Sequence, residues 1–147
     1  MPLYSARSKS SALLWPAELQ VAQDFMLTAP KVIAIIDDDP SILDAMDNLL
    51  SLMGYQTERY ASAEEFVDTA MKSKAAGLIV DMQLGGMSGL ELGYQLSAMG
   101  LTLPIIFVTG SQDKKLHADA LEFGCVAYLR KPFRTDVLAK AIADAVG

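Results

Sequence analysis

The feature that most constrains the fold is a regular alternation, from Lys31 onward, of short apolar runs with longer stretches of helical period. This alternation is typical of successive βα units around a parallel sheet. Five strands are predicted, at residues 32–36, 55–60, 78–80, 105–108 and 126–129. Four of them are continuously apolar, as strands covered on both faces should be. Residues 55–60 mix polar and apolar side chains and are predicted to form an edge strand.

The helices are predicted from apolar spacing and capping residues. An apolar stripe after the first strand recurs at helical spacing and is interpreted as core; its members are Ile42, Met46, Leu49, Leu50 and Met53. Ser62 with Glu65, and Ser88 with Glu91, have the spacing of capping boxes and predict the starts of the next two helices. Asp113 is expected to precede the fourth helix.

Composition restricts the class of protein. A chain of 147 residues, 52% of them apolar, matches one packed domain, and its longest apolar run is far below the roughly 18 residues of a membrane span. The only cysteine, Cys125, has no internal disulfide partner and is expected to be a small buried residue. The only histidine, His117, is expected on the solvent side of the fourth helix, so a zinc site is excluded. A cytoplasmic protein is predicted.

The net charge of −6 predicts partners other than nucleic acid. Residues 1–30 contribute nothing to this charge, because two basic residues offset two acidic ones. The basic residues of the domain are scattered, and an acidic domain repels a phosphate backbone. We expect protein partners and a metal cation, with no direct contact with nucleic acid or membrane.

Polar side chains gather where the predicted strands end. They are Asp37, Asp38 and Asp39 after the first strand, Asp81 after the third, Thr109 after the fourth and Lys131 after the fifth. Ligands of open α/β sheets bind beyond the carboxyl ends of the strands. We therefore expect acids, a hydroxyl and an ammonium at one edge of the sheet.

The clustered acids predict a metal site. Carboxylates about 4 Å apart repel by roughly 4 kcal/mol per pair at a surface-like dielectric, so a pocket of three acids favours a bound cation. Oxygen ligands without histidine or thiolate favour Mg2+, with Mn2+ as an alternative. Asp38 and Asp81 are the predicted direct ligands, and Asp37 is predicted to hold a metal-bound water. Asp81 can act as a nucleophile toward phosphorus, while Lys131 and Thr109 neutralise charge on the transferring group.

The strings IIDDDPS, GLIVDMQLGGMSGLEL, IIFVTG and YLRKPF occur in this order along the chain. Together they resemble the receiver domain of bacterial two-component response regulators over residues 31–147, with residues 1–30 as an N-terminal extension. The resemblance implies a flavodoxin-like (βα)5 fold, a three-layer sandwich with a parallel five-stranded sheet of order 2-1-3-4-5. It also implies a phosphorelay: a histidine kinase or histidine phosphotransfer protein phosphorylates Asp81 with Mg2+ as cofactor. Such a domain is a signalling phosphoprotein that catalyses its own phosphotransfer and dephosphorylation, not an enzyme.

The same resemblance assigns roles to single residues. Asp37 and Asp38 are the acidic pair, the backbone carbonyl of Gln83 ligates the metal, and Lys131 contacts the phosphoryl group. A partner-binding surface is expected at Ile42, Leu43, Ala45, Pro132 and Phe133. Leu43 is apolar where many relatives have a charged residue, and we expect it to be exposed.

The resemblance also implies a conformational switch. Thr109 and Tyr128 correspond to the switch pair, and the Tyr128 ring is expected to move from an exposed to a buried rotamer when Asp81 is phosphorylated. The face formed by the fourth helix, fifth strand and fifth helix should then bind a downstream protein, or form a homodimer, more tightly. Receiver domains usually carry a proline four residues after the acceptor aspartate. This chain has Gly85 at that position, followed by Gly86, so we expect the loop to have more backbone freedom.

Alternatives remain open from the sequence. A Mg2+-dependent phosphohydrolase with an aspartyl nucleophile usually has a second carboxylate where this chain has Gln83. A flavin carrier of the same fold class is disfavoured, because residues 37–39 would repel the phosphate of its cofactor. Residues 1–30 fit a short amphipathic helix from Pro16, with Trp15 and Phe25 as anchors, or a segment before a natural start at Met26. The end at Gly147 favours a single-domain response regulator over a receiver excised from a longer protein.

Overall fold

The computed structural model describes residues 16–21 and 29–147. Residues 17–21 are helical, as expected after Pro16, whereas Trp15, Phe25 and Met26 lie outside the described residues. The domain described below spans Lys31–Gly147. Among the described helices, none has the length and apolar character needed to cross a membrane.

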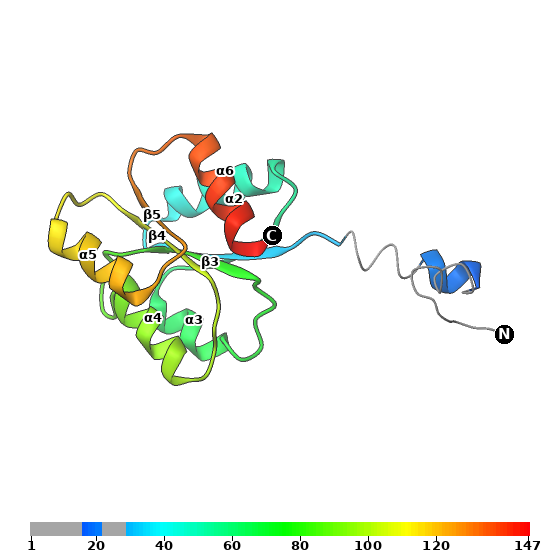
Figure 1. Cartoon of the computed structure of the whole chain (residues 1–147), viewed down its shortest axis with the longest axis horizontal. Helices are drawn as coiled ribbons and strands as arrows, with labels where there is room; N and C mark the ends of the chain where they lie inside the picture. Colours follow the sequence, from blue (N-terminus) through cyan, green and yellow to red (C-terminus); the bar gives the residue numbers. More distant parts are fainter. Residues whose placement is uncertain (1–15, 22–28) are drawn as a thin grey trace. The chain divides into compact units, whose positions relative to one another are not determined.

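Five strands and five helices alternate along the domain (Figure 1). In chain order they are β1 (Val32–Ile36), α2 (Pro40–Leu52), β2 (Gln56–Tyr60), α3 (Ala63–Thr69), β3 (Gly77–Asp81), α4 (Gly89–Ala98), β4 (Ile105–Thr109), α5 (Lys114–Phe123), β5 (Ala127–Arg130) and α6 (Thr135–Val146). All strand pairs are parallel, in the order β2-β1-β3-β4-β5. The flavodoxin-like fold and the edge position of the second strand are confirmed.

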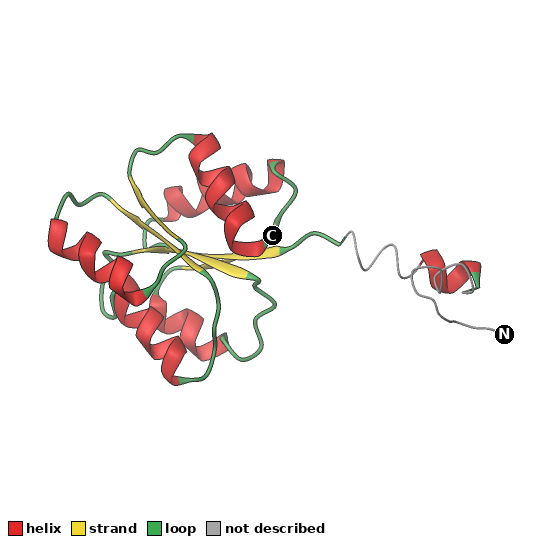
Figure 2. Ribbon diagram, in the orientation of Figure 1, coloured by secondary structure: helices red, strands yellow, loops and turns green. Residues whose placement is uncertain are grey.

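Helices cover both faces of the sheet and give three layers (Figures 1 and 2). On one face α2 and α6 pack over the sheet, and Leu50, Ile79 and Leu138 belong to their shared core. On the other face α3, α4 and α5 enclose a second core that contains Phe66 and Phe107. β3 and β4 are buried along their whole length. Their continuous apolar runs therefore follow from burial on both faces.

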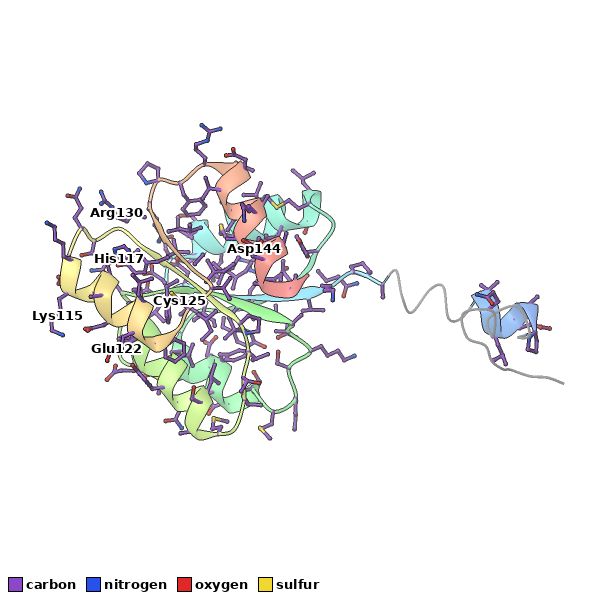
Figure 3. The ribbon with its side chains drawn as sticks, viewed as in Figure 1. Lys115, His117, Glu122, Cys125, Arg130 and Asp144 are labelled. Atoms are coloured by element: carbon purple, nitrogen blue, oxygen red, sulfur yellow. The ribbon has the colours of Figure 1, made fainter. Side chains whose placement is uncertain are left out.

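Three predictions about burial are wrong. β5 is the second edge strand and is half-buried rather than covered on both faces, with only Leu129 buried in it. Cys125, just before β5, is half-buried (Figure 3). Leu43 was expected to be exposed but is only 7% exposed and belongs to the core with Met46 and Leu50. The predicted stripe is otherwise core: Met46 and Leu50 are buried, and Ile42, Leu49 and Met53 are half-buried and pack against them.

The helix starts follow the predicted capping residues. The Ser88 hydroxyl accepts the N–H of Glu91, and the Glu91 carboxylate accepts the N–H of Ser88, which makes a capping box at α4. At α3 the Ser62 hydroxyl accepts the N–H of Glu65, but the Glu65 carboxylate accepts the N–H of Ala61 instead. Asp113 caps α5 by accepting the N–H of Lys115. These bonds satisfy first-turn donors and fix where each loop ends.

The start of α4 lies directly against the end of β3. The N–H of Gly89 donates to the carbonyl of Met82 at 3.2 Å. A Cβ built on Gly89 would lie 2.4 Å from the carbonyl oxygen of Asp81, a distance that no side chain tolerates. Glycine therefore allows the close approach that fixes α4 beside Asp81.

We predict that Gly89→Ala lowers the free energy of unfolding by about 1–3 kcal/mol in urea denaturation, because the added methyl group must push α4 away from β3. Gly85→Ala is the matched control, since a Cβ at Gly85 meets nothing within 4 Å and its φ is not positive. This control should change the free energy of unfolding by less than about 1 kcal/mol. Equal losses in both variants would contradict the contact.

Candidate phosphoryl-acceptor and metal site

Three aspartates from two neighbouring strands form the centre of the site. Asp37 and Asp38 follow β1, and Asp81 is the last residue of β3. Because β1 and β3 pair in parallel, their acids converge, and one carboxylate oxygen of each lies within 4.8 Å of the others. Asp37 and Asp81 are buried, whereas Asp38 is exposed. A compact donor set made of carboxylate oxygens fits Mg2+ or Mn2+ better than a softer metal.

Lys131, from the loop after β5, bridges the two buried acids. Its Nζ lies 3.2 Å from Oδ2 of Asp81 and 3.3 Å from Oδ2 of Asp37. The other oxygen of each acid accepts a backbone N–H: Oδ1 of Asp37 from Asp39 and Oδ1 of Asp81 from Gln83. Both carboxylates therefore have a fixed orientation.

Burial and charge act on these groups in opposite directions. Burial raises the pKa of Asp37 above its ordinary value, and the charge of Asp81 adds to the rise; the N–H of Asp39 and the Lys131 ammonium oppose it. Burial alone would lower the pKa of Lys131, but the charges of Asp81 and Asp37 outweigh it and the pKa is raised. Lys131 is therefore protonated at neutral pH. One ammonium beside three acids leaves excess negative charge, which favours a divalent cation.

Thr109 and Gln83 lie beside the acids. Thr109 ends β4 and is fully buried; its Oγ1 accepts the N–H of Ser111 at 3.0 Å and donates to Oε1 of Gln83 at 3.5 Å. The Gln83 side chain is exposed, while its N–H holds the backbone next to Asp81. The long contact with Gln83 is weak, so a stronger acceptor can replace it as partner of the Thr109 hydroxyl.

Tyr128 on β5 has a buried phenol oxygen with no hydrogen-bond partner among the described residues. Tyr128 pairs with Phe107 in the register, so its side chain shares a face of the sheet with Phe107 and Thr109. Its ring stacks on His117 of α5, with centroids 4.4 Å apart and planes 10° apart, and Figure 3 shows His117 between α5 and β5. Burial raises the pKa of Tyr128. The exposed rotamer expected before phosphorylation is not the one present, because the stack and the core hold the ring inward.

A cavity of about 460 Å³ adjoins the buried acids. Its polar lining comes from Asp37, Asp81 and Lys131. The apolar lining includes four of the five expected partner-binding residues, namely Ile42, Ala45, Pro132 and Phe133. Leu43 does not line it, since this residue is buried in the core under α2.

Two contacts near the site were not anticipated from the sequence. Glu64, at the start of α3, accepts the N–H of Met87 at 2.8 Å, although 23 residues separate them. No local pattern marks such a pair. His117 is exposed, as predicted for the solvent side of the fourth helix, and its helical position gave no signal for the stack on Tyr128.

Comparison with known proteins identifies relatives of this domain. The family described as "Response regulator receiver domain" matches residues 33–143. Response regulator protein TodT of Pseudomonas putida is 36% identical over 115 residues, which cover 78% of this chain and 51% of that protein. Transcriptional regulatory protein FixJ of Bradyrhizobium diazoefficiens is 32% identical over 121 residues, which cover 82% of this chain and 58% of that protein. The chain spans about half the length of the curated relatives it matches.

Solved structures show the same fold. The crystal structure of FixJ-N superposes with a TM-score of 0.75 at 28% identity and covers 79% of this chain and 93% of that one. The response regulator StyR superposes with a TM-score of 0.74 at 32% identity and covers 80% of this chain and 60% of that one. The matched residues include the three clustered aspartates and Lys131. The chain therefore belongs to the response regulator receiver domain family.

Proposed function

We propose that this receiver domain acts in a phosphorelay, in which Asp81 accepts a phosphoryl group from a histidine kinase or histidine phosphotransfer protein in a Mg2+-dependent reaction. The observation that carries the proposal is the bridge from Lys131 to Asp81 and Asp37 beside a third aspartate. A carboxylate nucleophile next to a lysine and a cation site suits transfer of an anionic group, because positive charge stabilises the phosphoryl oxygens.

Asp81 is the nucleophile in this proposal. Its Oδ1 accepts the N–H of Gln83, whereas Oδ2 contacts only the flexible ammonium of Lys131 among the described residues. Oδ2 is therefore the oxygen that attacks phosphorus. The O–P bond forms as the P–N bond to the donor imidazole breaks, and the imidazole nitrogen keeps the electron pair. Lys131 can then turn to the new phosphoryl oxygens.

The metal would be held by Asp37, Asp38 and Asp81, with the backbone carbonyl of Gln83 as a further ligand. When bound, Mg2+ supplies positive charge toward the phosphoryl oxygens. Asp38 is the exposed member of the three and is open to a cation that arrives from solvent. The backbone bonds to Asp37 and Asp81 orient the other two carboxylates in advance.

The cavity beside Asp81 is the proposed docking site for the phosphoryl donor. Its apolar rim contains Ile42 and Ala45 from α2 and Pro132 and Phe133 from the loop after β5. Such a rim can bury apolar side chains of a donor protein while the donor histidine reaches Asp81.

A second face, formed by α5, β5 and α6, is proposed for signal output to a downstream protein or a second copy of the chain. The Thr109 hydroxyl turns from Ser111 and Gln83 to a phosphoryl oxygen on Asp81, which changes the surroundings of the unpartnered Tyr128 phenol. Exposed apolar side chains occur on α5, just before β5 and on α6: Leu121, Val126 and Val137 are 58%, 40% and 44% exposed. A change at Tyr128 can therefore alter an apolar contact surface.

The phosphohydrolase alternative is not favoured. In place of the second carboxylate stands Gln83, whose amide accepts a hydrogen bond from Thr109 and does not titrate. Without a group that gives and takes protons at this position, hydrolysis would turn over slowly.

Addition of Mg2+ should raise the thermal stability of the protein, because a ligand at about 100 times its Kd stabilises the folded state by about 2.7 kcal/mol. Asp38→Ala should lose most of this rise in Tm. Asp68→Ala removes the same charge from the exposed surface of α3 and should keep it. An equal response of both variants to Mg2+, or none in the parent, argues against the site.

Acetyl phosphate with Mg2+ should add one phosphoryl group to the parent protein, as read by intact mass. Asp81→Asn should take up none, because the amide is not a nucleophile toward phosphorus. Asp68→Asn should react as the parent does. An adduct that persists in Asp81→Asn would mean that another residue is the acceptor.

Thr109→Ala should still accept phosphate but should lose most of the coupling to the output face, since its hydroxyl is the group proposed to move. In the parent, beryllofluoride should tighten binding of a cognate partner, or dimerisation measured by light scattering, by about fivefold or more. Thr109→Ser keeps the hydroxyl and should keep the response. A full response in Thr109→Ala would place the switch elsewhere.

A further inference from the structure

We propose that Glu64 is a positioning residue that holds the loop between β3 and α4 in place and thereby sets the affinity of the Asp81 site for a divalent cation. The inference rests on the proposed function, because it takes Gln83 in this loop as a metal ligand. The loop spans residues 82–88, between the acceptor and α4.

Both ends of this loop are fixed by contacts around Asp81. At its beginning, the N–H of Gln83 donates to Oδ1 of Asp81 at 2.8 Å, and Leu84 is buried in the core. At its end, the N–H of Gly89 donates to the carbonyl of Met82 at 3.2 Å. In the stretch between, the half-buried side chain of Met87 packs against the core, whereas Gly85 and Gly86 are exposed.

Glu64 restrains that middle stretch. Gly85 and Gly86 are exposed, and among the described residues the one hydrogen bond that joins residues 85–87 to another element runs from the Met87 N–H to Oε2 of Glu64, at 2.8 Å. This N–H also lowers the pKa of Glu64, because it favours the ionised carboxylate. The two glycines therefore do not leave the loop without a restraint.

Gly86 and Glu64 fit each other. Gly86 has a φ of +73°, a conformation that side chains rarely adopt, and a Cβ built there would lie 2.6 Å from Oε2 of Glu64. The glycine thus provides both the turn and the space through which the carboxylate reaches the Met87 N–H. The contact is specific to this pair, because Glu65 on the same turn of α3 binds the N–H of Ala61.

The restraint should strengthen metal binding because it reduces the conformational freedom of the loop before the metal binds. A backbone carbonyl ligates a cation only when its loop is in one arrangement, so a loop that is already held loses less entropy on binding. Loss of one hydrogen bond to a charged acceptor should weaken binding of Mg2+ by about three- to tenfold.

The test measures Mg2+ affinity by calorimetric titration of the full chain. Glu64→Ala should bind Mg2+ about three- to tenfold more weakly than the parent. Glu65→Ala, which removes an equal charge from the same turn, should bind as the parent does, and Glu64→Gln should keep most of the affinity because its amide oxygen can still accept the Met87 N–H. Equal affinities of Glu64→Ala and Glu65→Ala would overturn the proposal.

Two further measurements separate positioning from other effects. Adding Gly85→Pro to Glu64→Ala should restore affinity, because proline restricts the same loop and the Cβ of residue 85 has free space. Without metal, amide hydrogen exchange at Met87 should be faster in Glu64→Ala than in Glu65→Ala. Equal exchange would contradict the restraint itself, whereas a parent that binds no Mg2+ would contradict the proposed function.

Discussion

The ionic contact of Lys131 with Asp81 and Asp37 is the interaction on which the site depends. It joins three parts of the chain that only a sheet of this order brings together: β1 and β3 lie side by side, and the lysine arrives from beyond β5. Two buried carboxylates so close together would repel strongly without it. The ammonium offsets this repulsion and allows both acids to lie near one another.

Around this contact, backbone groups fix the orientation of the acidic side chains and the position of α4. The N–H groups of Asp39 and Gln83 orient the two buried acids, and Gly89 lets α4 approach the end of β3. Glu64 adds a restraint from α3 across the same loop. The chemistry of the site therefore rests on tight turns as much as on charged side chains, which explains Gly86 and Gly89.

The sequence predicted the strands and the acids because both follow from simple rules: buried parallel strands are apolar throughout, and polar residues at their carboxyl ends meet. Leu43 was misplaced because Ile42 and Leu43 are both apolar, so the pattern did not settle which one faces the core when each residue turns a helix by about 100°. Glu64 could not be found, since its partner Met87 is set by how the loop folds. The inward Tyr128 ring depends on stacking with His117, which periodicity alone does not report.

The most direct measurement of the central claim is to map the phosphorylated residue. Borohydride reduces an acyl phosphate on aspartate to homoserine, and digestion with peptide mass spectrometry locates the change. After treatment with a phosphoryl donor and Mg2+, we predict homoserine at position 81 alone, at a level that falls sharply in Lys131→Ala because the lysine no longer stabilises the phosphoryl oxygens. Homoserine at Asp37 or Asp38, or at position 81 to the same extent without Lys131, would contradict the account.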